Sequence, residues 1–288
     1  MNNVVQYVQC GEKRLVLRVY NNGENAARVA FEHAVLNELR KHPLSFAIPT
    51  TLPALDGGAS HVPLTNGAEA SMFELIPGTL PKLTHVRPIG RATGELTTAM
   101  YKISLPLESP TAPYYDIYKV HHAVTRDTFY ATVAGAAFNG VREATNYLVQ
   151  QLRSVESTIE ECHAMQLPAS LIHGDLHYDN VLVDQGKVSG LLDFEFCAKD
   201  WRAMEIAICL SKYVGEPEPM GYLTEFIEGY AEHGVLTAAE IKAVPALINL
   251  RVLSNVVRAH RCCFRETPCS QRARIAGVFC GAGAGGRG

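Results

Sequence analysis

The sequence changes its secondary-structure pattern once, near residues 73–78. Before this point, short runs rich in β-branched and aromatic residues predict strands at 4–8, 14–20, 48–52, 61–64 and 70–76, with one helix at 28–40. After it, apolar residues recur mainly at helical spacing and predict helices at 89–103, 141–165, 201–214, 222–233 and 237–257. The sequence therefore predicts an α+β fold of two lobes, a small antiparallel β-sheet lobe with one helix and a larger, mainly α-helical lobe.

The same change of pattern sets the predicted domain boundaries. We place the sheet-containing lobe at 1–78 and the helical lobe at 79–257. The remaining segment, 258–288, holds six arginines, six glycines and one glutamate, and it ends in a Gly- and Ala-rich run. Because low-complexity composition of this kind does not build a packed core, we expect this tail to be disordered.

Composition limits the classes of function. The chain has 288 residues, of which 47% are hydrophobic and 19% are charged, as in ordinary globular proteins. A formal net charge of -3 argues against bulk binding of nucleic acid, and the sequence contains no run of 18 apolar residues. We therefore expect neither a nucleic acid nor a membrane as partner, and composition indicates no particular oligomeric state.

The eight cysteines divide into two groups. Cys10, Cys162, Cys197 and Cys209 lie in apolar surroundings. We interpret them as small buried side chains of a protein in a reducing compartment, which predicts a cytoplasmic location. The other four lie in the final 27 residues and lack the paired Cys-x-x-Cys spacing that is typical of zinc sites.

Polar residues stand at fixed spacing within an otherwise apolar stretch, 171–183. His173, Asp175 and Asn180 fit His-x-Asp-x-x-x-x-Asn, the catalytic-loop spacing of kinases. Asp193 follows a second short apolar run. Phosphoryl transfer needs a group that orients the attacking hydroxyl and accepts its proton, and hard oxygen ligands for Mg²⁺. We therefore predict Asp175 as the base and Asn180 and Asp193 as metal ligands, with His173 bracing the loop.

Two other interpretations of these residues stay open. A single His or Asp beside a strand is most often a cap or a turn residue, so only the joint order and spacing favour catalysis. A metal site built from His173, Asp175 and His177 is the rival, although no further ligand pair follows at a suitable spacing.

Two short segments carry a resemblance to a known family. His-Gly-Asp-Leu-His at 173–177 and Leu-Asp-Phe-Glu at 192–195 resemble the aminoglycoside phosphotransferase and choline kinase superfamily, which has a protein-kinase-like fold. Protein kinases instead carry Arg after the His and Gly after the Asp-Phe pair. The resemblance covers roughly residues 1–257, and it implies ATP and Mg²⁺ as cofactors, with residues 1–78 as the nucleotide-binding lobe.

The resemblance also implies roles for residues outside the two motifs. Arg18 stands in the strand whose basic residue faces the nucleotide phosphates, although the family has Lys there. Glu32 stands where a helix Glu pairs with that residue. The main chain at Glu74 and Ile76 is similar to the hinge that meets adenine. Glu195 is either a further magnesium ligand or the cap of the next helix.

Candidate residues for the acceptor follow the metal motif. Asp200 and Trp201 present a carboxylate beside an aromatic face, which suits an ammonium group, and Arg202 or Arg251 suits a carboxylate. The alternative is that Trp201 anchors the core and that both arginines are solvated. The tyrosine-rich loop 114–118 is either a second wall of this site or a packed surface loop.

Within the superfamily, residues 249–257 and the turn at 21–23 look most like a homoserine kinase-like group. We expect an ATP-dependent kinase that transfers the γ-phosphoryl group to the hydroxyl of a small metabolite, with homoserine first and choline or another amino alcohol next. A protein kinase is disfavoured, because the loop between Glu195 and Trp201 is too short for an activation segment.

The N-terminal residues suggest an alternative function. The sequence starts at Met1-Asn2-Asn3, where the resemblance implies the turn that covers the phosphates, and no Gly-rich loop precedes it. The alternative is therefore a catalytically inactive, kinase-like binding protein with a truncated phosphate loop.

Overall fold

The computed structural model describes residues 3–20, 26–55, 57–119 and 125–260. The chain divides into two compact units, Met1–Thr111 with Leu167–Val244, and Ala112–Gln166 with Pro245–Gly288. These borders differ from the lobes at 1–78 and 79–257, because the sheet and the two polar motifs fall in one unit. The predicted turn at 21–23 and residues 261–288 of the predicted tail lie outside the described residues.

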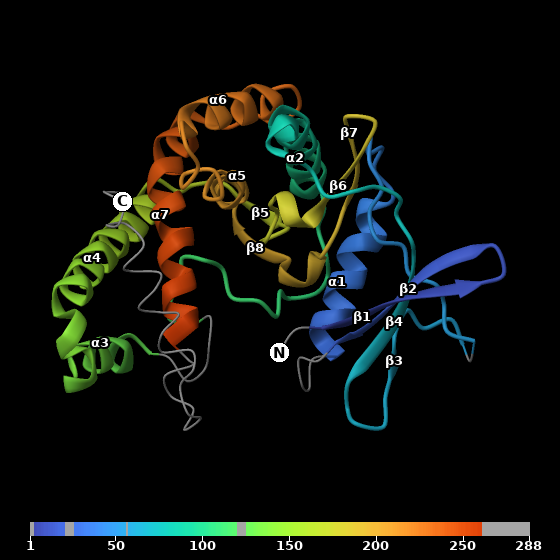
Figure 1. The fold of residues 1–288 in the computed structure, drawn as a ribbon, viewed down its shortest axis with the longest axis horizontal. Helices are drawn as coiled ribbons and strands as arrows, with labels where there is room; N and C mark the ends of the chain where they lie inside the picture. The colour runs from blue at the N-terminus through green and yellow to red at the C-terminus, as the bar shows by residue number, and fades with distance from the viewer. Residues whose placement is uncertain (1–2, 21–25, 56, 120–124, 261–288) are drawn as a thin grey trace, which may run out of the picture. The chain divides into compact units, whose positions relative to one another are not determined.

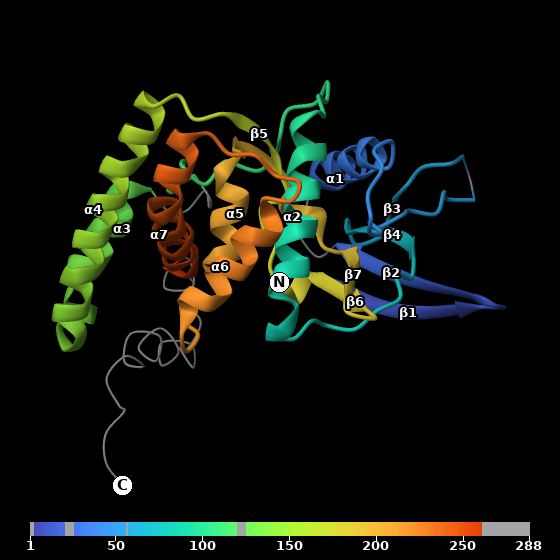
Figure 2. The ribbon, with the colours of Figure 1, turned by 90° about the horizontal axis from the view of Figure 1, so that it is seen from above.

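A four-stranded antiparallel sheet with the strand order β1-β2-β4-β3 forms one part of the first unit (Figures 1 and 2). Its strands are β1 (Val4–Cys10), β2 (Lys13–Tyr20), β3 (Val62–Pro63) and β4 (Glu69–Glu74). Gly11 begins the two-residue turn between β1 and β2 with a φ of 60°, a left-handed conformation that glycine adopts without steric cost. Helix α1 (Ala26–Leu39) packs against the sheet, since the rings of His33 and Phe73 meet edge to face at 5.8 Å.

The strand predicted at 48–52 is wrong. The segment makes only isolated bridges, Thr51 to Phe73 and, just before it, Ala47 to Gly190. Pro49 explains the difference, because proline has no backbone N–H to donate to a ladder.

Two short two-stranded antiparallel sheets and three helices complete the part of the first unit that carries the motifs. One sheet pairs β5 (Ala169–Ile172) with β8 (Ala198–Trp201), and the other is the hairpin of β6 (Val181–Asp184) and β7 (Lys187–Leu191). The helices are α2 (Val86–Tyr101), α5 (Ala203–Leu210) and α6 (Pro219–Tyr230), and α6 runs beside α2 in both ribbon views (Figures 1 and 2). The fully buried side chains of Leu96, Leu176 and Phe226 belong to the core of this part of the first unit.

Two glycines allow α2 and α6 to pack closely. A Cβ on Gly90 of α2 would clash with the backbone oxygen of Phe226, and a Cβ on Gly229 of α6 would clash with the backbone oxygen of Arg87. Because backbone atoms line both contacts, the helices would have to separate to accept a methyl group.

We therefore expect Gly90→Ala to lower the free energy of unfolding by about 2 kcal/mol, measured by urea denaturation. Gly221→Ala is the matched control on α6, because a Cβ at Gly221 meets no atom within 4 Å. We expect this control to be neutral or slightly stabilising, since alanine favours helices more than glycine does. Equal effects of the two substitutions would contradict close packing at Gly90.

The second unit contains α3 (Arg126–Ala134) and α4 (Arg142–Ala164), together with the end of α7 (Ala238–His260) from Pro245 onward. The spacing of apolar residues did not predict α3. Glu156 of α4 ties α3 to α4, since Arg126 donates to both of its carboxylate oxygens at 2.9 Å and Tyr130 donates to one of them at 3.2 Å. These contacts with α4 stabilise α3, whose own apolar residues show only weak helical periodicity.

The other helix predictions are confirmed apart from their ends. The helix predicted at 201–214 is shorter, ending at Leu210, and α7 continues through Pro245. Thr237 and Glu240 cap the start of α7 reciprocally: the Thr237 N–H donates to the Glu240 carboxylate at 2.8 Å, and the Glu240 N–H donates to the Thr237 hydroxyl at 3.2 Å. Among the described residues, the structure contains no helix with the length and apolar character of a membrane span.

One cysteine prediction is wrong. Cys162, Cys197 and Cys209 are buried, but Cys10 is exposed, because it ends β1 at the outer edge of the sheet. The tail cysteines lie outside the described residues.

Candidate functional site

The loop after β5 turns sharply at Gly174. Its φ is 80°, and a Cβ there would clash with the backbone oxygen of Phe196, so only glycine fits. The turn allows the two residues that flank it, His173 and Asp175, to hydrogen-bond, with the Asp175 N–H donating to His173 Nδ1 at 3.3 Å.

His173 connects the two polar motifs. Its ring is fully buried, and because Nδ1 accepts from Asp175, Nε2 carries the hydrogen that it donates to the Leu192 carbonyl at 2.8 Å. Burial lowers the pKa of His173, so the ring is neutral and acts as a brace between the two loops.

Asn180 lies beside Asp193 across the β6–β7 hairpin. The Leu192 N–H donates to the Asn180 backbone oxygen at 2.8 Å, which places residue 193 next to residue 180 in space. The Asn180 side-chain amide also donates to the Asp175 backbone oxygen at 2.9 Å, so its Oδ1 stays available as an oxygen ligand. The three predicted residues Asp175, Asn180 and Asp193 are thus linked by hydrogen bonds through the main chain.

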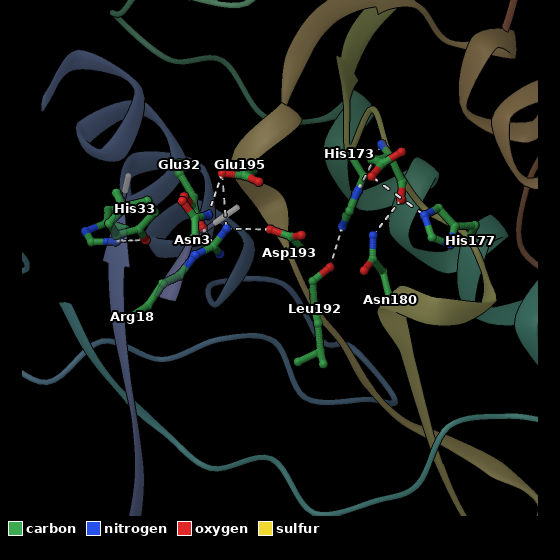
Figure 3. Close-up of polar contacts among 12 residues, drawn as sticks. Asn3, Arg18, Glu32, His33, His173, His177, Asn180, Leu192, Asp193 and Glu195 are labelled. Carbon is green, nitrogen blue, oxygen red and sulfur yellow. Dashed lines mark hydrogen bonds and ion pairs between the residues drawn. The ribbon is translucent and has the colours of Figure 1, made fainter. Parts of the chain in front are cut away.

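Arg18 of β2 reaches the metal motif directly (Figure 3). Its Nη2 lies 2.6 Å from Asp193 and 3.2 Å from Glu195, and its Nη1 lies 3.4 Å from Glu32 of α1. Burial opposes the charge on Arg18, but the carboxylates outweigh it and raise the pKa of the guanidinium. Burial raises the pKa of Glu32 to about 7, against the opposing effect of Arg18.

The two carboxylates of Asp193 and Glu195 both bond to a single nitrogen of Arg18, so they converge on one cationic group. Asn180 adds an amide oxygen from the neighbouring strand end. Carboxylate and amide oxygens are the ligands that Mg²⁺ prefers, and these residues therefore fit such an ion.

The rival metal site is contradicted. Both ring nitrogens of His173 are engaged in the loop, and no group of three or more His, Cys, Asp or Glu side chains in the described part of the chain is arranged to hold a metal. His177 instead lies between two carboxylates, with Nε2 3.6 Å from Asp175 and Nδ1 3.2 Å from Asp179.

Glu205 is a further candidate residue, which the sequence motifs did not predict. It is buried on α5, and its Oε2 accepts the backbone N–H groups of His173 and, at 3.4 Å, Gly174. The carboxylate therefore holds the main chain of the loop that carries Asp175. The signal in the sequence was a single acid within the otherwise apolar run Ala203–Leu210.

Burial raises the pKa of Glu205 from 4.5 to about 7, although the two backbone N–H groups oppose this shift. The folded protein thus binds this proton more tightly than the unfolded chain does. The contribution of Glu205 to the free energy of unfolding is therefore greatest below pH 4.5 and falls as the pH rises to 7.

Glutamine cannot ionise. We therefore expect the decrease in the free energy of unfolding between pH 4.5 and 7 to be smaller in Glu205→Gln than in the unchanged protein, by on the order of 3 kcal/mol. Urea denaturation of both proteins across this range measures the difference. Parallel pH profiles for the two proteins would show that Glu205 has an ordinary pKa.

Glu74 and Ile76, which the resemblance implies as the hinge, lie at the end of β4 and just after it. The Glu74 N–H donates to Thr50 at 3.0 Å, and Ile76 follows two residues later. The side chain of Ile76 packs over Gly190 of β7, where a Cβ would be too close to it.

The acceptor candidates are more enclosed than the sequence analysis expected. Trp201 is 4% exposed, and Asp200 is fully buried and accepts the Trp201 N–H at 2.6 Å. Arg202 donates to both oxygens of Glu240, at 3.0 and 2.6 Å. These contacts favour the alternative interpretation of Trp201 as a core anchor and make Arg202 a structural partner of Glu240.

In the second unit, Arg251 is 5% exposed, which contradicts the alternative that it is solvated. It donates to Asn255 at 2.7 Å and lies over the ring of Tyr114, 5.4 Å from its centre. Tyr114 is itself buried, which favours a packed loop at 114–118.

A small antiparallel sheet with one helix, joined to a His-Gly-Asp loop and an Asp-Phe-Glu motif, defines a kinase-like phosphotransferase. The model of the phosphotransferase enzyme family (APH) matches residues 2–241. The chain belongs to this family, and the resemblance carried by the two motifs is confirmed.

Curated relatives and solved structures are similar to this chain. The homoserine kinase of Rhizobium meliloti (strain 1021) is 28% identical over 238 residues, which are 81% of this chain and 68% of that kinase. The structure resembles an amicoumacin kinase solved with AMP-PNP and Ca²⁺ (TM-score 0.64, 17% identity, 96% of this chain and 86% of that one). It also resembles a microcompartment-associated aminopropanol kinase (TM-score 0.64, 20% identity, 96% and 89%). The two-lobed, kinase-like fold is thus confirmed.

Proposed function

We propose that the chain is an ATP- and Mg²⁺-dependent kinase that transfers the γ-phosphoryl group to the hydroxyl of a small alcohol, with homoserine as the first candidate. The observation that carries the proposal is the main-chain linkage of Asp175, Asn180 and Asp193. The Asn180 amide donates to the Asp175 backbone, and Leu192 donates to the Asn180 backbone. A base and two metal ligands from separate loops therefore belong to one rigid cluster.

Each residue of this cluster has a defined task. Asp175 orients the acceptor hydroxyl for in-line attack and takes its proton late in the transfer. Asn180, Asp193 and Glu195 would hold Mg²⁺, which neutralises negative charge on the phosphates when it is bound. Arg18 binds phosphate oxygens, and Glu32 orients the guanidinium from α1.

The protein scaffold limits the freedom of these groups. His173 and Glu205 hold the loop from its buried side, through the Leu192 carbonyl and the His173 and Gly174 N–H groups. The base is therefore held in place before substrate binds, which reduces the entropy that must be lost in the transition state.

The acceptor is inferred from the relatives. Homoserine kinases are 26–28% identical to this chain over about 240 residues, and a structural neighbour is an aminopropanol kinase. Both names describe kinases of small amino alcohols, so homoserine comes first, and choline or another amino alcohol comes next.

A panel of acceptors tests the proposal. ADP release is measured with homoserine, choline, ethanolamine, aminopropanol, methylthioribose and an aminoglycoside, and the product is identified by mass spectrometry. We expect the highest kcat/KM with homoserine. ADP release with another amino alcohol alone would move the proposal to that acceptor.

A thermal-shift assay with Mg-ATP distinguishes an active kinase from the alternative, a catalytically inactive binding protein. A ligand that binds only the folded state raises the melting temperature, so a kinase is stabilised by millimolar Mg-ATP. No stabilisation and no ADP release with any acceptor would support the alternative of a catalytically inactive, kinase-like binding protein.

A further inference from the structure

One arginine nitrogen binds both carboxylates of the metal motif. Nη2 of Arg18 lies 2.6 Å from Asp193 Oδ1 and 3.2 Å from Glu195 Oε2, while Nη1 faces Glu32 (Figure 3). The Arg18 side chain is only 12% exposed, so solvent screens these ion pairs weakly. Arg18 therefore stands where a divalent ion would meet the same two carboxylates.

The pairing is strengthened by the contacts around it. Asn3 donates to the same Glu195 oxygen at 2.8 Å and so holds that carboxylate toward Arg18. Short, charge-assisted bonds such as the one to Asp193 are stronger than neutral hydrogen bonds. Withdrawing Arg18 without a replacement cation would leave the carboxylates of Glu32, Asp193 and Glu195 uncompensated, which is most costly for the buried Glu32 and less so for the two half-buried groups.

One N–H donor of the Arg18 guanidinium makes no hydrogen bond within the described residues. Nε of Arg18 is buried and has no acceptor among the described residues. Arginine presents its donors as a planar fork, so it can bind a phosphate through some of them and a carboxylate through others. A triphosphate would therefore offer Arg18 an alternative anion and release Asp193.

We propose that Arg18 competes with the divalent ion for Asp193 and Glu195, so that metal binds strongly only together with nucleotide. This inference rests on the proposed function, because it assigns the metal to Asp193 and the nucleotide to the same site. Linkage requires this effect to be reciprocal. The factor by which bound nucleotide raises the affinity for metal equals the factor by which bound metal raises the affinity for nucleotide.

Mn²⁺ binding without nucleotide tests this competition, with electron paramagnetic resonance reporting the free ion. Arg18→Gln keeps a polar side chain and removes the competing charge. We expect it to bind Mn²⁺ at least about 10-fold more tightly than the unchanged protein, within the usual range of coupling between sites. Arg14→Gln is the matched control. Arg14 is exposed and lies four residues away on β2, and its substitution removes the same charge.

Two further variants keep the test decisive. Arg18→Lys retains a cation and so protects the fold, but it lacks the fork and is expected to bind Mn²⁺ with intermediate affinity. The double variant Arg18→Gln with Asp193→Asn should lose the gain, which assigns the ion to Asp193. In the unchanged protein, adding AMP-PNP should tighten Mn²⁺ binding by a similar factor.

The outcomes separate this inference from the proposed function. Equal Mn²⁺ affinity in Arg18→Gln and Arg14→Gln, or tight binding to the unchanged protein without nucleotide, would overturn the competition while leaving the kinase proposal intact. Failure of AMP-PNP to bind together with Mn²⁺ in every variant would overturn both.

Discussion

Replacement of Asp175 with asparagine is expected to lower kcat by at least about 100-fold with the preferred acceptor, because the variant cannot accept the proton of the attacking hydroxyl. Asparagine has nearly the same shape, and the main-chain bond from Asn180 to residue 175 does not depend on the side chain. Stabilisation by Mg-ATP in a thermal-shift assay should therefore stay close to that of the unchanged protein. ADP-coupled kinetics measure the loss.

Asp179→Asn is the matched control in the same loop. The Asp179 side chain is 55% exposed. It contacts Nδ1 of His177, whereas Asp175 contacts Nε2. Because exposed ion pairs contribute little, we expect its kcat to change by less than about fivefold. Similar rates for Asp175→Asn and the unchanged protein would reject Asp175 as the base.

Replacement of Asp193 with asparagine is expected to remove both turnover and the response to metal. A divalent ion contributes several kcal/mol of charge stabilisation in phosphoryl transfer, so we expect kcat/KM to fall by at least about 1000-fold. The increase in melting temperature with Mg-ATP, relative to ATP with EDTA, should also disappear. Kinetics and thermal shifts on the same preparation measure the two effects.

Asp184→Asn serves as the control for Asp193, because Asp184 lies on the hairpin that precedes Asp193, opposite Lys187, and is exposed. We expect this control to retain its response to Mg-ATP. Retention of that response by Asp193→Asn would place the metal elsewhere and would remove the basis of the magnesium assignment.

Local patterns predicted much of the fold. The spacing of apolar residues located α1, α2, α4, α6 and α7, because helical periodicity is visible within a few turns of sequence. The same reasoning failed at 48–52, where Pro49 prevents a regular ladder, and at α3, whose support comes from Glu156 of another helix. It failed also at Cys10, whose exposure follows from the position of β1 at the sheet edge.

The candidate site divides in a similar way. His173, Asp175 and Asn180 were predicted because their spacing within one loop is itself the signal. Glu205 was missed, because a carboxylate acts on that loop only after α5 packs behind it. Arg202 was considered for the acceptor, yet its partner Glu240 lies 38 residues away, beyond any local pattern.

The sequence by itself determined which residues carry oxygen and nitrogen donors and in what order they occur, since order and spacing are properties of the chain. Tertiary structure alone decided which of them meet. Arg18 and Asp193 are 175 residues apart and yet 2.6 Å from each other, and burial raises the pKa of Glu32 and Glu205 to about 7. Desolvation and long-range ion pairing depend on what surrounds a group in space, and for that reason no local pattern in the chain encodes them.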